Sequence, residues 1–571
     1  MLGPEEIRKG ELPGMQRNRW FVAVTCVAMA VFLLTSTGLA EPAPYVVSPA
    51  VRNVYHKLMS QPAVKQGLDF LKADQERTVA EQREICAIPA PPFKEQMRAQ
   101  DYLKRLAALG LRDVQMDAEG NVFGLRPGTG VGPKLLVAAH LDTVFPEGTE
   151  TTVKEKDGRL YAPGIADDAR GLAALLSVLR AFNATGIKTV GDIIFCGNVG
   201  EEGLGDLRGV KALFRDHKDI DGFISIDGSG SENITYLATG SHRYEITYQG
   251  PGGHSFGAFG LPSAIHALGR AIAKIADLQT PREPKTTFTV GTVSGGTSVN
   301  SIAAEAKMQV DMRSNSEEEL LKLEAKFLEI VKQAAAEENA RWGSDKMTVD
   351  IKLVGDRPAG TQPASATIVQ AAWAATEAVG QSPKLGEPSS TDANLPISLG
   401  IPAITIGGGG RAGGGHSPGE WYDPTDAYFG PQRIFLTILG LVGMEGVSEP
   451  LLVKGAGRSL SLEVNGAALA APVAPYRLGN RVMIPLRAAA EALGGKVTYE
   501  QASKSVEVEL AGHVLQVTQG SPRATLDGRT LELPLAVGVV QDRTIVPLEA
   551  FTALSLKVEM AQDGQLVRIK P

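Results

Sequence analysis

The chain has 571 residues, a length that exceeds one typical domain and predicts three or four compact units. Hydrophobic residues make up 43% and charged residues 21% of it, a balance that excludes a largely disordered or a membrane-embedded protein. The net charge is only -7, and no lysine and arginine cluster is present, so nucleic acid is not an expected partner.

The first 40 residues have the pattern of a targeting segment. Arg17 and Arg19 precede an apolar stretch at 21–34, and small residues end the segment at Ala40. The stretch is shorter than the about 20 residues that span a membrane. We therefore expect a signal peptide and a secreted or cell-surface protein, with an uncleaved membrane anchor as the alternative.

Two cysteines remain once this segment is removed. Cys86 and Cys196 both stand beside apolar residues. We expect two buried free thiols in preference to a disulfide.

Strand-like apolar runs alternate with helical patterns from about residue 45 to 240. This alternation predicts an α/β unit with a mostly parallel sheet flanked by helices. The important strands are expected at 134–139, 192–196 and 222–226.

The pattern then changes to the order β-α-β-β-α-β, which is typical of a ferredoxin-like sandwich. Its elements are expected at 242–249, 262–275, 287–293, 304–312, 317–338 and 347–353. The α/β pattern resumes afterwards with a strand at 402–406 and a helix at 431–444, so the small α+β domain is expected to be an insertion.

The end of the chain carries an internal repeat. "NRVMIPLRAAAEALGGKVTYE", from Asn480, resembles "DRTIVPLEAFTALSLKVEM", from Asp542, which predicts a small α+β repeat domain. The expected boundaries are 1–40 for the signal peptide, 41–239 and 354–447 for the larger domain, 240–353 for the insertion, 448–457 for a linker and 458–571 for the repeat domain.

Acidic residues and histidines follow the predicted strands of the larger domain, where open α/β sheets place their binding crevice. In "LLVAAHLD", His140 and Asp142 are two residues apart and face the same way, so the carboxylate can orient a metal-bound imidazole. The same motif is also consistent with an ordinary solvated strand end.

Two pairs of adjacent acids come next. Asp167 and Asp168 stand in "APGIADDARG", and Glu201 and Glu202 in "CGNVGEEGLGDLRG". Adjacent carboxylates repel unless a cation compensates them. In the second pair, one acid can bind metal while the other takes a proton from water. Taken singly, either pair is equally consistent with a surface acid cluster.

Asp227 in "FISIDGSG" and His416 after a glycine-rich loop complete the set. A lone histidine is more often structural, but the whole set offers the ligands that two Zn²⁺ ions need. Two metals sharing a carboxylate hold an acidic water that attacks a carbonyl. Co²⁺ or Mn²⁺ could substitute.

The combined motifs resemble the di-zinc metallopeptidase family of glutamate carboxypeptidase, peptidase T, acetylornithine deacetylase and succinyl-diaminopimelate desuccinylase. The resemblance runs from about Cys86 to Gly443 and rests on "HLD" at 140–142, "GIADDARG" at 164–171, "GEEG" at 200–203, "GGHS" at 252–255 and "STDAN" at 390–394. It implies a zinc-exopeptidase fold.

The resemblance also implies the ligand set. His140 and Asp227 would bind one zinc ion, Glu202 and His416 the other, and Asp167 would bridge both.

Three further roles follow from the same resemblance. Glu201 would be the general base and Asp142 would orient His140. The peptide bond between Asp167 and Asp168 would be cis. The family's pattern is broken at Ala169 and Arg170, where many relatives have other residues; this affects the start of a helix and no ligand.

The inserted domain of such proteins serves as a dimerisation lid, which implies a homodimer. His254 in "GPGGHSFG" would stabilise the oxyanion, often from the partner subunit, and Asn300 in "GGTSVNSIAAE" would assist it. Arg357 in "GDRPAG" would grip a substrate carboxylate, although a surface salt bridge is its alternative.

The repeat domain resembles the copper amine oxidase N-terminal-like domain. Copper is not expected there, because His513 is its single histidine and it has no cysteine. A contact with the cell wall is the expected role, and a stabilising appendage is the alternative.

The favoured function is a secreted zinc-dependent exopeptidase that cleaves short peptides near a free terminus. An amidohydrolase that removes the acyl group from an N-acyl amino acid uses the same ligands and is the rival. A non-catalytic cell-surface binding protein is the third hypothesis.

Overall fold

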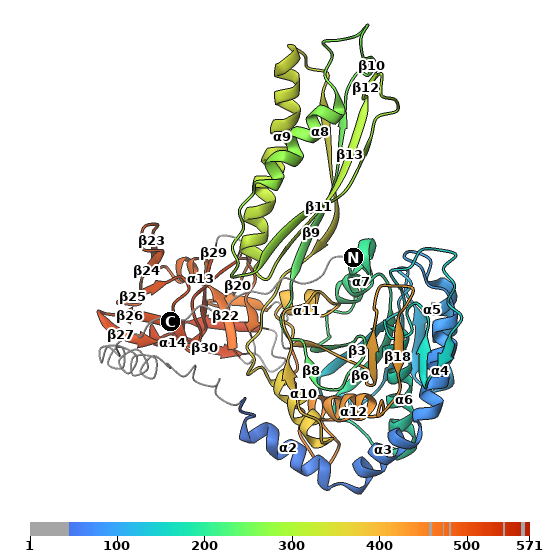
Figure 1. Ribbon diagram of the computed structural model, residues 1–571. Coiled ribbons are helices and arrows are strands. Elements are labelled where there is room, and N and C mark those ends of the chain that lie inside the picture. The colour runs from blue at the N-terminus through green and yellow to red at the C-terminus, as the bar shows by residue number, and fades with distance from the viewer. Residues whose placement is uncertain (1–44, 456–459, 472, 479–480, 541–542, 561–565) are drawn as a thin grey trace, which may run out of the picture. The chain divides into compact units, whose positions relative to one another are not determined.

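A computed structural model describes residues 45–571 except 456–459, 472, 479–480, 541–542 and 561–565 (Figure 1). The expected signal peptide therefore lies outside the described residues, as do part of the expected linker, the start of the repeat domain at 458, and Asn480 and Asp542 at the starts of the two copies. No helix among the described residues is long and apolar enough to cross a membrane.

Helices open the described part of the chain. They are α2 (Pro49–Ser60), α3 (Pro62–Ala73), α4 (Gln75–Ala87) and α5 (Gln96–Ala108). A proline begins α2 and α3, where its missing N–H costs no hydrogen bond. The helices α3 and α4 pack on α6 (Ala169–Thr185), and α5 packs on the edge of the central sheet.

The central sheet has six strands in the order β1-β2-β6-β3-β7-β16. They are β1 (Arg112–Met116), β2 (Val122–Arg126), β3 (Lys134–His140), β6 (Asp192–Asn198), β7 (Gly222–Ile226) and β16 (Ala403–Ile406). The strands β6, β3, β7 and β16 run parallel to one another. The strand β2 is antiparallel to β6, and β1 is antiparallel to β2. The helices α6 and α12 (Phe429–Val442) pack on β3.

The parallel strands are buried on both faces, which explains their continuous apolar sequences. The mixed α/β fold expected from the sequence is confirmed, and the strands at 134–139, 192–196 and 222–226 are β3, β6 and β7. Cys86 and Cys196 are buried free thiols, as predicted.

The larger domain has further elements outside the central sheet. They are β4 (Lys154–Lys156), β5 (Arg159–Tyr161), a 3-10 turn (Gly203–Gly205), α7 (Arg208–Asp216), β8 (Asn233–Ile234), α10 (Thr367–Ala378), β15 (Lys384–Leu385), α11 (Asn394–Ser398), β17 (Arg411–Gly413) and β18 (Trp421–Asp423). They form two small sheets, β17-β18-β5-β4 and β15-β8.

Between β8 and α10 the chain forms a separate antiparallel sheet with strand order β11-β13-β9-β14. Helices α8 and α9 cover one face of it (Figure 1). The elements are β9 (Gly240–Gln249), β10 (Gly253–His254), α8 (Ala264–Ala276), β11 (Thr286–Gly295), β12 (Ser301–Ile302), β13 (Glu305–Ser314), α9 (Glu317–Trp342) and β14 (Thr348–Arg357). The main elements follow the predicted β-α-β-β-α-β order, and we call residues 240–357 the inserted unit.

The last strand of the inserted unit is longer than the sequence predicted. The strand expected at 347–353 continues to Arg357, because the register shifts between Leu353 and Gly355 and pairing with β9 resumes. Arg357 therefore ends a strand, where the sequence placed it in a loop.

The C-terminal module, residues 460–571, contains three small sheets, β20-β19-β31-β30, β21-β22-β29-β28 and β23-β24-β25-β26-β27. Its elements are β19 (Ser461–Val464), β20 (Ala467–Leu469), β21 (Tyr476–Leu478), β22 (Arg481–Pro485), α13 (Leu486–Ala492), β23 (Lys496–Glu500), β24 (Ser505–Leu510), β25 (His513–Thr518), β26 (Arg523–Leu526), β27 (Arg529–Glu532), β28 (Gly538–Val540), β29 (Arg543–Pro547), α14 (Glu549–Ala553), β30 (Lys557–Met560) and β31 (Leu566–Lys570).

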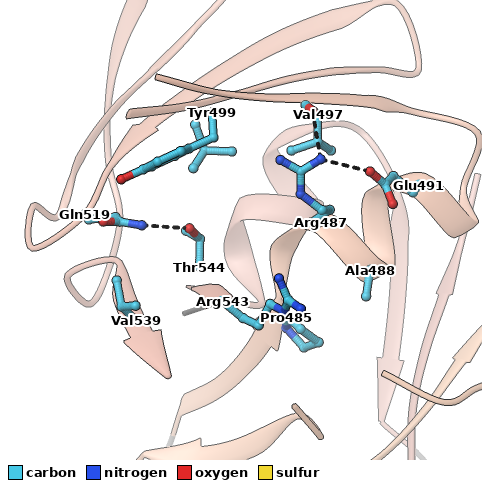
Figure 2. A pocket seen from close by; sticks show the side chains of 11 residues that line it. Pro485, Arg487, Ala488, Glu491, Val497, Tyr499, Gln519, Val539, Arg543 and Thr544 are labelled. Atoms are coloured by element: carbon cyan, nitrogen blue, oxygen red, sulfur yellow. Dashed lines mark hydrogen bonds and ion pairs between the residues drawn. The ribbon is translucent and has the colours of Figure 1, made fainter. Parts of the chain in front are cut away.

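The two repeat copies meet at the antiparallel pair β22 and β29. Met483 pairs with Pro547, and Pro485 pairs with Ile545. Because 483 and 485 correspond to 545 and 547 in the repeat, this reciprocal pairing relates the copies by an approximate two-fold axis. A cavity of about 570 Å³ opens beside this pair (Figure 2).

Candidate metal centre

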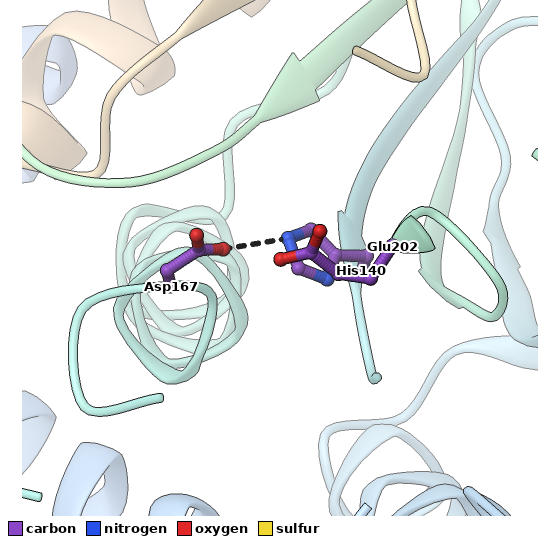
Figure 3. Close-up of side chains that lie close together, drawn as sticks. All are labelled: His140, Asp167 and Glu202. Atoms are coloured by element: carbon purple, nitrogen blue, oxygen red, sulfur yellow. Dashed lines mark hydrogen bonds and ion pairs between the residues drawn. The ribbon is translucent and has the colours of Figure 1, made fainter. Parts of the chain in front are cut away.

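Three of the predicted ligands lie together at the carboxyl end of β3 (Figure 3). One ligand atom each from His140, Asp167 and Glu202 lie within 4.8 Å of one another. Nε2 of His140 is 2.9 Å from Oδ1 of Asp167. His140 is buried at the end of β3, so a strand of the central sheet holds this ligand.

His416 joins this cluster from a distant part of the sequence. Its Nε2 lies 3.1 Å from Oδ2 of Asp167 and 3.1 Å from Oε1 of Glu202. The glycine-rich loop that carries it needs small residues, since a Cβ added at Gly407 would lie 2.0 Å from the carbonyl oxygen of Ser229. The φ of His416 is +60°, a strained value of the kind found at functional sites.

Asp227 follows β7 directly, as expected for a ligand on the neighbouring strand. Burial and the nearby charge of Asp167 raise its pKa, while the charge of His140 opposes this rise. The structure thus places Asp167 in contact with His140 and His416, and His416 in contact with Glu202, while Asp227 stands at the same edge of the sheet.

Asp142 connects the His140 loop to the Glu201–Glu202 loop. Its Oδ1 accepts a hydrogen bond from the N–H of Glu201 at 3.1 Å, and its Oδ2 accepts one from the N–H of Glu202 at 2.8 Å. Nδ1 of His140 is 3.0 Å from the backbone oxygen of Asp142 and 3.7 Å from its carboxylate. The residue therefore orients the imidazole mainly through its main chain.

The peptide bond between Asp167 and Asp168 is cis, as the resemblance implied. The Asp168 carboxylate is buried and caps α6, accepting hydrogen bonds from the N–H of Gly171 at 3.0 Å and of His140 at 3.1 Å. Asp168 therefore stabilises the backbone of this loop, whereas the side chain of Asp167 contacts His140 and His416.

Glu420 is a site residue that the sequence analysis missed. Its buried carboxylate accepts hydrogen bonds from the N–H groups of Gly164 at 2.9 Å, Ala166 at 2.8 Å and Asp167 at 3.1 Å. It fixes the backbone that presents Asp167. The signal was its position four residues after His416, in "HSPGEWYD".

The sequence analysis also did not indicate a contact between Asn198 on β6 and Asp392 in the "STDAN" segment. Nδ2 of Asn198 donates to Oδ2 of Asp392 at 2.7 Å, and both side chains are fully buried. Burial raises the pKa of Asp392 to about 7. The segment was noticed in the sequence, but nothing in it indicated Asn198 as the partner.

The predicted general base, Glu201, is held by an arginine. Nη1 of Arg357 lies 3.3 Å from Oε1 of Glu201 and 3.2 Å from Oγ of Ser390, and its Nη2 donates to the backbone oxygen of Glu201. Arg357 is only 4% exposed. Its predicted grip on a substrate carboxylate stays a prediction, and a substrate would have to displace these contacts.

The electrostatics of the cluster fit a divalent cation. Burial is the main cause that raises the pKa of Glu201 to about 7, of Glu202 to about 8 and of Asp227 to about 6. A hydrogen bond to Asp167 raises the pKa of His416 to about 9. Carboxylates and imidazoles that lie this close together are the donor set of a zinc site, and a cation would compensate the charge of the carboxylates.

His254 and Asn300 lie together, but in the inserted unit. Both line a cavity of about 630 Å³ formed by β10, β12 and the end of β11. Nδ1 of His254 accepts from the N–H of Gly257 at 3.2 Å, and Oδ1 of Asn300 accepts from Oγ of Ser298 at 2.7 Å. Among the described residues, their side-chain hydrogen bonds all stay within this unit, so their catalytic roles stay predictions.

The fold and the cluster together define a mixed α/β protein with a buried histidine–carboxylate site, suited to metal, at the carboxyl edge of its parallel strands. The sequence matches Peptidase family M20/M25/M40 over residues 136–439. This is more than half of the chain, which therefore belongs to that family. Residues 463–569 match the copper amine oxidase N-terminal domain.

Curated relatives share part of this region. Carboxypeptidase G2 from a Pseudomonas species is 25% identical over 199 residues, covering 34% of this chain and 47% of that protein. A succinyl-diaminopimelate desuccinylase from Corynebacterium glutamicum is 26% identical over 215 residues, covering 37% and 57%. The chain spans about half the length of these relatives.

Solved structures of similar fold cover more of their own length. A tripeptidase from Staphylococcus aureus has a TM-score of 0.53 at 24% identity, covering 64% of this chain and 97% of that one. An aminopeptidase from Bacillus cereus has a TM-score of 0.52 at 24% identity, covering 64% and 98%. A dinuclear metal binding peptidase from Bacillus subtilis has a TM-score of 0.50 at 17% identity, covering 65% and 99%. These likenesses show the fold.

Proposed function

We propose that the chain is a metal-dependent exopeptidase that hydrolyses a peptide bond near a free terminus of a short peptide. The observation that carries the proposal is the cluster of buried His140 and Glu202, partly buried Asp167 and exposed His416, with Glu201 beside it. Membership of a peptidase family supports it. The names of the similar proteins, which include a tripeptidase and a carboxypeptidase, support peptides as the substrate class.

Two zinc ions would suit this donor set: His140 and Asp227 would hold one, Glu202 and His416 would hold the other, and Asp167 would contribute to both. When bound, such a pair supplies Lewis-acid polarisation of the substrate carbonyl and makes a water more acidic. The Bacillus subtilis protein of similar fold is described as a dinuclear metal binding peptidase, which supports two metal ions per chain.

The chain's own residues handle the proton. The Glu201 carboxylate accepts a proton from the attacking water and returns it to the nitrogen of the leaving amine. Arg357 and the backbone hydrogen bonds to Asp142 hold Glu201 in place during this transfer. Asp142 also fixes the ring of His140.

The rival is an amidohydrolase that cleaves an N-acyl amino acid. The similarity to a desuccinylase favours it, because that enzyme's name describes removal of an acyl group. The same residues serve both reactions, so only substrate preference separates them. Secretion, which the residues at 17–40 indicate, favours peptides, because peptide fragments are what an exported hydrolase meets.

A homodimer formed through the inserted unit belongs to the same proposal. One face of its sheet carries the helices, while β11 is an edge strand with exposed residues over most of its length. In a dimer, His254 and Asn300 would reach the partner's cluster. Sedimentation of the full-length chain tests this part separately from activity.

The test is hydrolysis of dipeptides, tripeptides and N-acetyl and N-succinyl amino acids by the wild type and by Glu201→Gln, with bound metal measured in both. We expect peptides to be cleaved and Glu201→Gln to keep its metal while kcat/KM falls by about 10²–10⁴-fold. Glu445→Gln, an exposed acid of the same domain, is the control and should act like the wild type.

Cleavage of acyl amino acids alone would establish the rival function. A wild type that holds no metal and cleaves nothing would leave only a binding protein.

A further inference from the structure

The cavity in the C-terminal module has the character of a small-molecule site. Its volume of about 570 Å³ lies within the about 300–1,000 Å³ typical of ligand pockets. The lining comes from β22, α13, β23, β24, β28 and β29, together with a residue that follows β25 (Figure 2), and it includes Arg487, Glu491, Arg543, Val497, Val506 and Val539.

Tyr499 lines this cavity, although its position in β23 directs its side chain to the same face as the core. It lies two residues after Val497 on β23, so both side chains face the same side of the sheet. Val497 is 9% exposed and belongs to the core, whereas Tyr499 is 44% exposed. The ring therefore forms a free wall of the cavity, available for stacking on a flat apolar group.

Two guanidinium groups face the same space. Nη1 of Arg487 donates to Oε1 of Glu491 and to the backbone oxygen of Val497, both at 3.1 Å, which holds the side chain in place. Arg543 makes no ion pair and no side-chain hydrogen bond within the described part of the chain. Two arginines against one glutamate leave one net positive charge in the lining.

The two repeat copies differ at Arg487 and Tyr499, whereas Arg543 corresponds to Arg481 of the first copy. Both copies keep the proline and leucine at the strand end and the Lys-Val pair of the later strand, which build the framework. In the second copy, Glu549 stands where the first has Arg487, and Met560 stands where the first has Tyr499. Because the second copy has other residues at these two positions, Arg487 and Tyr499 are not needed for the repeat fold. Their presence in the cavity therefore has another reason.

We propose that this cavity binds an organic carboxylate with a flat apolar body, such as an aromatic acid or a peptide end that carries one. The guanidinium groups of Arg487 and Arg543 would take the carboxylate, the Tyr499 ring would stack on the body, and the valines would form the floor. Neutral sugars fit poorly, because the amide of Gln519 already donates to Thr544 at 3.0 Å and Glu491 is engaged.

The test uses 3-phenylpropanoate as the probe and 3-phenylpropanamide as its neutral equivalent, with the full-length chain and ligand-observed NMR. A probe of this size should bind with a Kd on the order of 1 mM. We expect the acid to bind at least tenfold more tightly than the amide. We also expect Arg543→Gln and Tyr499→Leu each to weaken the acid tenfold or more without changing hydrolysis at the metal centre.

Arg529→Gln is the matched control, because it removes an exposed arginine of the same module outside the cavity. Equal binding of acid and amide, or unchanged binding by Arg543→Gln, would overturn the proposal. Stronger binding of phenyl phosphate would overturn the carboxylate assignment. Circular dichroism of each variant checks that the module is folded.

A second arm separates the two sources of such a group. It compares acetyl-Gly-Gly-Phe as the free acid and as the amide, in a full-length chain that carries Glu201→Gln so that nothing is cleaved. Binding of the free-acid peptide that is lost in Arg543→Gln identifies a peptide terminus as the ligand. Binding of 3-phenylpropanoate alone identifies a free small acid.

Discussion

Glu420 shows how a side chain that need not touch metal can control a metal centre. Three backbone N–H groups of the loop that presents Asp167 converge on its buried carboxylate. Each such charge-assisted hydrogen bond contributes about 1.5–3 kcal/mol. The position of Asp167 therefore depends on Glu420.

Glu420→Gln should weaken metal binding by about tenfold or more, because the amide has one acceptor oxygen where the carboxylate has two. The measurement is competition with a chelator of known affinity, compared with Glu445→Gln. A variant that melts earlier but binds metal as tightly as the wild type would show that Glu420 only stabilises the fold.

His242, in the inserted unit, gives a prediction about pH. Burial disfavours its charged form, but a hydrogen bond to Asp356 and the charges of Glu324 and Glu317 outweigh this and raise its pKa. A raised pKa means that His242 adds stability that is fully present below its unfolded pKa of about 6.5 and is lost as the pH rises through the higher folded value.

His242→Gln should therefore lower the Tm of the inserted unit more at pH 6 than at pH 9. Thermal unfolding of both proteins across this range checks it, with His266→Gln, an exposed histidine of α8, as the control. A difference between wild type and variant that is constant with pH, or larger at pH 9, would contradict the assignment.

Helix α6 is the element that joins the cluster to the rest of the larger domain. It starts at the Asp168 cap and is buried along nearly its whole length. Near its end, Arg180 is 5% exposed and binds Asp74 at 2.6 Å and Glu81 at 2.7 Å, which ties α6 to α4 and to the turn that precedes it. Removing one partner of a buried ion pair leaves an uncompensated charge.

Arg180→Met should cost about 3–5 kcal/mol of stability. Arg83→Met, which breaks an exposed ion pair with Glu155, should cost at most about 1 kcal/mol. Urea unfolding followed by circular dichroism compares the two. Equal costs would mean that the Arg180 network carries no special share of the stability of the larger domain.

The strands that carry the cluster could be predicted because each is a short, continuous apolar run that ends at turn residues. Continuous apolar runs bounded by turn residues gave β3, β6 and β7 almost to the residue. Their ends are where parallel sheets hold ligands, which made His140 and Asp227 candidates. The β14 bulge was not predictable, because a register shift depends on the partner strand β9.

The missed residues share one cause. Glu420 lies more than 250 positions from the loop that it holds, and Asn198 lies 194 positions from Asp392. A single sequence contains no sign of such pairings, because each residue alone is an ordinary polar side chain. The contact between Arg357 and Glu201 escaped for the same reason.

Taken as a whole, the molecule combines a domain that carries the proposed metal centre with a module that has its own core and no predicted metal ligand. Ligand binding stabilises only the part that binds. Removing metal with a chelator should therefore lower the unfolding temperature of the larger domain and leave that of the C-terminal module unchanged. Calorimetry with and without added Zn²⁺ resolves the two transitions, and a shift in both, or in neither, would contradict this picture.

The central claim is that His140, Asp167, Glu202 and His416 hold the metal that hydrolysis requires. The most direct measurement is the zinc content and tripeptide hydrolysis of the wild type and of Asp167→Asn after dialysis against Zn²⁺. We expect about two zinc ions per wild-type chain and fewer in Asp167→Asn, and we expect hydrolysis to be lost together with the zinc. Full hydrolysis by a variant or a wild-type chain that holds no zinc would contradict it.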